Sequence, residues 1–132
     1  MGWHISTASR APIYQQLAQQ IREAIARGEL QPEAALPSVR QLSRELVVNP
    51  NTVARAYTEL ERAGLLISRP GRGVYVAQPR NDLTRAARDR RLTEQLDRWL
   101  TEAVHLGYSA DEVLQLVGKR VREFHWQTEG AA

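Results

Sequence analysis

Apolar residues near the start of the chain recur every four residues, which is the spacing of an amphipathic helix. The repeating positions are Ile13, Leu17, Ile21 and Ile25. This spacing gathers them on one face of a helix, where they can be buried together. Gly28 is suited to end the helix, because glycine readily adopts the left-handed conformation that often follows a helical C-terminus.

Two shorter amphipathic segments follow, separated by a tight turn. Ser38 and Gln41 have the spacing of a capping box, which predicts a short helix over 39–46. Asn49 is a favoured N-cap and Pro50 a favoured first residue for a third helix. The expected buried stripe of this third helix, which ends near Gly64, consists of Val53, Ala56, Tyr57, Leu60 and Ala63.

The pattern then changes to strand character in the segment LLISRPGRGVYVAQ. β-Branched and aromatic residues lie on both sides of a Pro-Gly turn, which is typical of a β-hairpin. We predict strands at 65–68 and 74–77, with 69–73 at the tip. Three helices closed by a hairpin make a winged helix-turn-helix.

The remainder of the chain has a different organisation, and the change near residues 78–81 marks the expected domain boundary. Helical spacing of apolar residues predicts a long helix over 81–106, and Ser109 with Glu112 opens another helix. The predicted fold is therefore mainly α with a small β-hairpin. A winged helix-turn-helix over 1–79 precedes a two-helix dimerisation tail over 80–132.

Composition places the chain among globular proteins, with 42% apolar and 25% charged residues. The absence of cysteine excludes disulfides and thiolate zinc sites. We find neither a long apolar run nor a hydrophobic leader, so we expect a cytoplasmic protein without a membrane span.

Positive charge is concentrated in the first half of the chain. Residues 1–79 contain nine arginines and six acidic residues, whereas basic and acidic residues balance at nine each over 80–132. This distribution favours an acidic partner, with nucleic acid as the first candidate. An excess of three charges also falls within ordinary scatter, so charge alone does not decide the partner.

Polar residues at the start of the third helix have the chemistry needed to read DNA bases. Asn51 and Arg55 lie one turn apart on the exposed face, with Thr52 between them. Asparagine can pair with adenine and arginine with guanine through two hydrogen bonds each. Recognition helices present such N-terminal residues to the major groove of duplex DNA. The alternative is a solvated face on which Asn-Pro-Asn is only a helix cap.

Two further basic elements favour the DNA interpretation. Arg40 lies in the first turn of the short second helix, where free backbone N–H groups also suit a phosphate. Arg69 and Arg72 lie at the hairpin tip, from which Arg72 can enter a minor groove. Three basic elements with one common partner explain the pattern better than a helix cap alone.

Residues 12–76 resemble the DNA-binding domain of GntR-family bacterial transcription regulators. The resemblance rests on the motifs PIYQQ, LPSVRQL, NPNTVARAYTELE and GRG at family-like spacings. The short two-helix tail is similar to that of the YtrA-type subgroup, whose members are dimeric repressors often located beside transporter genes. By this resemblance, DNA contacts are implied for Arg40, Asn49, Asn51, Thr52, Arg55, Arg72 and Gly73.

The chain departs from this family at two positions where glycine is usual. Val47 stands in the bend of the helix-turn-helix, and Glu33 stands in the loop before Pro37. A β-branched residue is costly in the left-handed conformation that glycine adopts easily. The resemblance therefore leaves the geometry of both loops open.

The two tail helices carry apolar stripes too wide to cover one another, with Trp126 as a further candidate for this surface. Uncovered apolar area of this kind normally marks an interface, so we predict a homodimer that reads inverted half-sites. The alternative is a monomer in which the tail folds back on the winged helix. The predicted interface residues are Leu96, Trp99, Leu100, Val113, Leu116, Val117, Val121 and Phe124.

Other chemistry is not indicated by the sequence. His4, His105 and His125 lack metal-ligand spacing, and no glycine-rich phosphate loop is present, so we predict no metal, cofactor or enzymatic activity. The tail is too short to enclose a conventional pocket, although a ligand between subunits stays open. We predict a sequence-specific regulator, most simply a repressor; the competing hypothesis is a protein-interaction module without a DNA operator.

Overall fold

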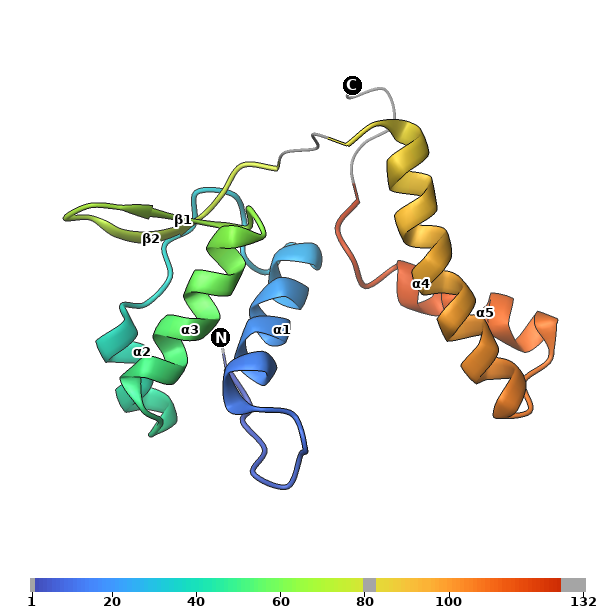
Figure 1. The fold of residues 1–132 in the computed structure, drawn as a ribbon, viewed down its shortest axis with the longest axis horizontal. Helices are drawn as coiled ribbons and strands as arrows, with labels where there is room; N and C mark the ends of the chain where they lie inside the picture. Colours follow the sequence, from blue (N-terminus) through green and yellow to red (C-terminus); the bar gives the residue numbers. More distant parts are fainter. Residues whose placement is uncertain (1, 80–82, 127–132) are drawn as a thin grey trace. The chain divides into compact units, whose positions relative to one another are not determined.

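The computed structural model describes residues 2–79 and 83–126, and these form two compact units. The first unit comprises residues 2–79 together with His125 and Trp126, and the second comprises 83–124. The first contains α1 (Ile13–Ala26), α2 (Val39–Leu46), α3 (Pro50–Arg62), β1 (Leu66–Arg69) and β2 (Gly73–Val76), and the second contains α4 (Arg85–His105) and α5 (Ala110–Val121) (Figure 1).

The predicted fold class is confirmed: the described residues form five helices and an antiparallel hairpin in the expected order. The bounds of three elements differ slightly from the prediction. The strands at 66–69 and 73–76 are each displaced by one residue, so that Arg69 pairs with Gly73 and only 70–72 form the turn. The first tail helix begins at Arg85, after the N-cap Thr84; residues 81 and 82 lie outside the described part.

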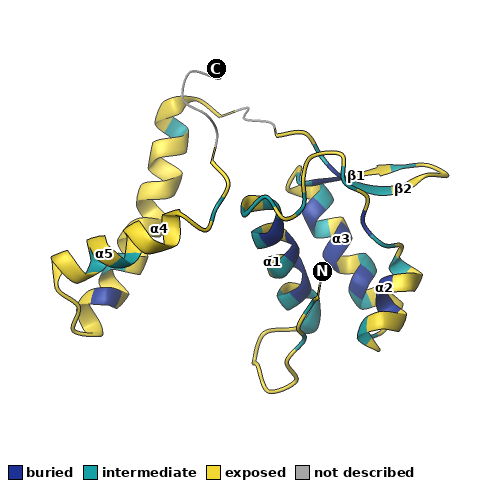
Figure 2. Ribbon diagram, turned by 180° about the vertical axis from the view of Figure 1, so that it is seen from behind, coloured by how far each residue is buried: buried dark blue, intermediate teal, exposed yellow. Residues whose placement is uncertain are grey.

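The core of the first unit is built where α1 packs against α3. Leu17 and Ile21 of α1 and Val53 and Leu60 of α3 have no solvent exposure. Figure 2 shows these buried faces as inward-facing stripes of the two helices. Burying one side chain of this size contributes roughly 1.5–3 kcal/mol, so this contact stabilises the unit by several such contributions.

Side-chain hydrogen bonds fix the joint between α2 and α3. The Tyr57 hydroxyl donates to the carbonyl oxygen of Pro37 at 2.7 Å, and burial raises the pKa of Tyr57 above its ordinary value. The Ser38 hydroxyl accepts from the Gln41 N–H at 3.0 Å, and the Asn49 side-chain oxygen accepts from the Asn51 N–H at 2.8 Å. Both helix N-termini are therefore capped and held in place.

The two loop positions at which the sequence lacks the expected glycine are both left-handed. Val47 has φ 55° and Glu33 has φ 71°. Val47 ends α2, and its side chain is 89% exposed, so it gains no burial in return for the strained backbone. The helix-turn-helix bend is thus kept in the conformation that glycine would adopt.

The root of the hairpin is joined to the loop before α2. The Glu33 N–H donates to the carbonyl of Val76 at 2.8 Å, the Val76 N–H donates to that of Ala34 at 2.9 Å, and the Leu36 N–H donates to that of Val74 at 2.9 Å. This loop therefore covers the edge of β2 that β1 leaves open.

The N-terminal segment lies along α1 through a ladder that the sequence analysis missed. The side-chain amide of Gln16 pairs with both backbone groups of Ser6, accepting from its N–H at 2.8 Å and donating to its carbonyl at 2.9 Å. One turn later, Gln20 pairs with the two backbone groups of His4 in the same manner. These contacts bring Trp3 and Ile5 against the core.

In the second unit, α4 and α5 leave most of their apolar side chains exposed. Ser109 and Glu112 form the predicted capping box, with both reciprocal hydrogen bonds present. Among the residues described in this unit, Ala103 alone is buried (Figure 2). This exposure agrees with the prediction that the apolar faces of the two tail helices cannot cover one another.

We predict that Val47→Gly stabilises the protein by about 0.5–1 kcal/mol, because glycine relieves the left-handed strain but adds chain entropy to the unfolded state. The matched control is Val48→Gly, at a neighbouring half-buried position without positive φ, which should destabilise. Urea unfolding measures both changes. Destabilisation by Val47→Gly would contradict the strain assigned to this bend.

Candidate DNA-binding surface

The N-terminus of α3 presents polar side chains on a rigid base. Asn51 and Arg55 are exposed one turn apart, and Thr52 between them is half-buried. The first turn of α3 contains no acidic residue, so nothing in it opposes an approaching phosphate. The opposite stripe of the helix is buried in the core, which fixes the direction in which this edge faces.

Arg55 has an aromatic partner that the sequence analysis did not identify. Its guanidinium carbon lies 3.8 Å from the centre of the Tyr14 ring in the first turn of α1. Such a cation–π contact contributes about 0.5–1 kcal/mol at an exposed site. The contact limits the positions available to the guanidinium without removing its hydrogen-bond donors. The PIYQQ motif contains Tyr14, but spacing alone could not connect it to α3.

Arg40 and Asn49 are the other two polar residues of the helix-turn-helix that are proposed to contact DNA. Arg40 is exposed in the first turn of α2, which also lacks acidic residues. The side-chain oxygen of Asn49 is engaged in capping α3, so its NH₂ group is the part suited to donate to a phosphate. Both residues stand at helix N-termini, where the helix dipole favours an anion.

The two arginines of the hairpin have different environments. Arg72 is exposed in the turn, and its carbonyl accepts from the Tyr75 hydroxyl at 3.1 Å. Arg69 forms an ion pair with Glu33 and lies 4.7 Å over the Tyr75 ring. Arg69 is therefore partly neutralised and tied to the body of the unit. Gly73 follows the turn with φ 118°, a conformation that L side chains rarely adopt.

The hairpin and α2 project from the first unit on the side opposite α1 (Figures 1 and 2). The same side therefore carries α2, which contains Arg40, and the hairpin, whose turn contains Arg72 (Figure 1). Asn51 and Arg55 lie at the α3 terminus that follows α2 directly. Sequence reasoning missed the contacts of Tyr14 with Arg55 and of Glu33 with Arg69, since each joins residues distant in sequence.

The part of the chain that the structure describes contains no candidate metal-binding cluster and no candidate membrane-spanning helix. No group of three or more His, Cys, Asp or Glu side chains in this part of the chain is placed to hold a metal ion. Within the same residues, no helix combines the length and apolar character that a membrane crossing requires.

Comparison with known proteins identifies related regulators. A family model described as bacterial regulatory proteins, gntR family, matches residues 13–76. The HTH-type transcriptional repressor YtrA of Bacillus subtilis is 35% identical over 109 residues, which cover 83% of this chain and 84% of the relative. Because 109 residues exceed the length of the winged helix, this similarity extends into the tail.

Solved structures agree in fold. A transcriptional antiterminator from Listeria monocytogenes EGD-e has a TM-score of 0.79 and 30% identity, covering 98% of both chains. AraR(DBD) in complex with operator ORE1 has a TM-score of 0.50 and 27% identity, covering 58% of this chain and 94% of that chain.

We predict that the ion pair at the hairpin root is lost only in acid. The hydrogen bond from Arg69, followed by that from Gln78, lowers the pKa of Glu33 below its ordinary value of 4.5. A carboxylate with a lowered folded-state pKa stabilises the fold above its unfolded value and ceases to do so as the pH falls through the folded one. NMR should show Glu33 and the hairpin amides changing together below pH 4.5, and Glu33→Gln should abolish that change. A Glu33 titration midpoint at or above pH 4.5 would contradict the stabilisation of its carboxylate by Arg69.

Proposed function

Because the chain belongs to the GntR family of bacterial regulatory proteins and is a DNA-binding transcription regulator, we propose that it represses transcription as a cytoplasmic homodimer on an inverted-repeat operator. The observation that carries this proposal is the acid-free, exposed N-terminus of α3, with Asn51 and Arg55 held one turn apart. Repression is supported by the similarity to YtrA, which is named a repressor.

In this proposal α3 enters the major groove and reads bases at its N-terminal end. Asn51 pairs with an adenine and Arg55 with a guanine, each discriminating by roughly 1–3 kcal/mol. Stacking on Tyr14 reduces the side-chain freedom that Arg55 loses on binding. Thr52, Asn49 and Arg40 contact phosphates and fix the register of the helix on the duplex.

The hairpin acts as the wing. Arg72 and Gly73 approach the minor groove, where a narrow groove concentrates negative potential. The exposure of Arg72 supports this role. Arg69 contributes less charge to DNA because Glu33 engages its guanidinium, and it acts mainly by holding the wing at a fixed angle.

The tail forms the dimer interface in this proposal. Leu96, Trp99, Val117 and Val121 are 49%, 40%, 38% and 41% exposed, and exposed apolar side chains gathered on one pair of helices mark an interaction surface. A second copy can cover such a face, because a twofold interface uses the same patch on both subunits. The half-buried members of the predicted interface are Leu100, Val113, Leu116 and Phe124.

The alternative function, a winged-helix interaction module without an operator, differs in its response to salt. DNA binding through arginine releases counterions from the duplex, so affinity falls steeply as salt rises. A gel-shift titration against DNA fragments selected by the purified protein distinguishes the two. No preference for selected over random fragments would favour the interaction module.

We predict that alanine substitutions of Arg55 and Arg72 change DNA binding in different ways. Arg55→Ala should reduce discrimination between matched and mismatched operators by about 1–3 kcal/mol, because it removes a base contact. Arg72→Ala should weaken binding to both operators alike and lower the salt dependence. Arg62→Ala, at the far end of α3, is the matched control with little effect. Equal losses on both operators for Arg55→Ala would refute base reading by this residue.

We predict that charge placed on the tail face separates the dimer. The double variant Leu96→Glu with Val117→Glu should be monomeric by analytical ultracentrifugation, because it would place like charges inside the interface. Leu114→Glu is the control, since Leu114 is 69% exposed and is absent from the predicted interface. A dimeric double variant with intact helical circular dichroism would move the interface elsewhere.

A further inference from the structure

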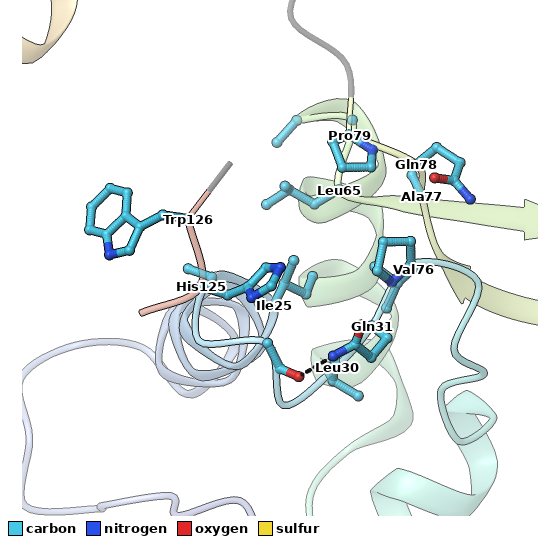
Figure 3. A pocket seen from close by; sticks show the side chains of 15 residues that line it. Ile25, Leu30, Gln31, Leu65, Val76, Ala77, Gln78, Pro79, His125 and Trp126 are labelled. Carbon is cyan, nitrogen blue, oxygen red and sulfur yellow. Dashed lines mark hydrogen bonds between the residues drawn. The ribbon is translucent and has the colours of Figure 1, made fainter. Parts of the chain in front are cut away.

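A cavity of about 540 Å³ lies in the first unit at the end of α1 opposite Tyr14. Figure 3 shows Leu65 and Pro79 on one side and Ile25 and His125 on the other, with the Trp126 ring standing apart. The segment that contains His125 and Trp126 follows the tail helices in sequence, yet it lines the cavity together with residues of the winged helix. Neither the sequence analysis nor the DNA interface gives this cavity a role.

Hydrogen bonds hold the walls of the cavity in place. The His125 N–H donates to the carbonyl of Ala26 at 2.7 Å, at the C-terminus of α1. Gln31 donates from its side chain to the carbonyl of Gly28 at 2.9 Å, which fixes the loop after that helix. A β-carbon at Gly28 would lie 3.1 Å from that of His125, so glycine leaves the room that this segment occupies.

The chemistry of the lining selects a class of ligand. The described residues that line the cavity include no Asp, Glu, Lys or Arg. Ile25, Leu30, Leu65 and Val76 supply apolar surface, while side chains such as Gln78 offer hydrogen bonds. A charged ligand would lose its hydration here, and His125 is the one titratable side chain among the described lining residues that could face it. The volume falls in the range of roughly 300–1,000 Å³ that small-molecule sites occupy.

We propose that this cavity is a binding site for an uncharged, predominantly apolar small molecule with one or two hydrogen-bonding groups. The ligand contacts Leu65 and Ile25 through its apolar part and reaches Gln31 or Gln78 through its polar part. It also contacts residues 77–79, which lead from the winged helix to the tail, and His125–Trp126, which follow the tail helices in sequence. Ligand binding therefore stabilises the attachment of the C-terminal segment to α1.

The site is tested with a pair of dyes that differ in charge. N-Phenyl-1-naphthylamine is neutral and fluoresces strongly in apolar surroundings, and 8-anilinonaphthalene-1-sulfonate has the same ring system with a sulfonate. The full-length protein should bind the neutral dye at one saturable site per chain and at least tenfold more tightly than the sulfonate.

Variants locate the dye on the chain. Ala63 is exposed, has helical backbone angles and lines the cavity, so Ala63→Phe should fill space and weaken binding of the neutral dye at least fivefold. Arg62→Phe is the matched control, one residue outside the lining, and should bind as the parent protein does. Trp126→Ala, at a residue 60% exposed, should also weaken binding without unfolding the protein.

The exposed tail face is the competing site for an apolar dye. The double variant Leu96→Glu with Val117→Glu should therefore retain the saturable binding. Loss of binding in that variant, unchanged binding in both Ala63→Phe and Trp126→Ala, or equal affinity for the two dyes would overturn the proposal. These outcomes do not involve DNA, so they are independent of the proposed operator binding.

Discussion

The contact between α1 and α3 determines what the rest of the first unit can do. Leu17 and Ile21 from one helix and Val53 and Leu60 from the other are fully buried in it. Once that stripe of α3 is fixed, helical periodicity places Asn51 and Arg55 on the outside. The same packing brings Tyr14 of α1 beneath the Arg55 guanidinium. The energy that stabilises the fold thus also orients the residues proposed to read DNA.

A second constraint fixes the orientation of the hairpin relative to this core. Glu33 adopts a left-handed backbone conformation that glycine would adopt without strain, and its carboxylate engages Arg69 of the hairpin. The backbone of the same loop pairs with β2. Glu33 thus makes a side-chain contact that glycine cannot make. The two positions at which the family usually has glycine therefore differ: the side chain of Glu33 makes a contact within the fold, and that of Val47 is exposed.

Local periodicity and capping were sufficient to predict the elements, because hydrophobic spacing and residues such as Ser38, Asn49 and Ser109 act within a few positions along the chain. Contacts between distant residues could not be predicted in this way. The pairing of Gln16 and Gln20 with the N-terminal backbone, the stacking of Arg55 and the docking of the segment at His125 all depend on tertiary packing. Composition offers no signal for such contacts, since each joins segments brought together only by the completed core.

The most direct test of the account is to titrate the isotope-labelled protein with an operator selected from random DNA and to follow every backbone amide by NMR. If α3 enters the major groove, the largest shifts fall on residues 50–55 and on the turn at 70–72, with small shifts in α4 and α5. Unperturbed amides at the start of α3, combined with large shifts confined to the tail helices, would contradict the claim that this helix terminus meets the bases.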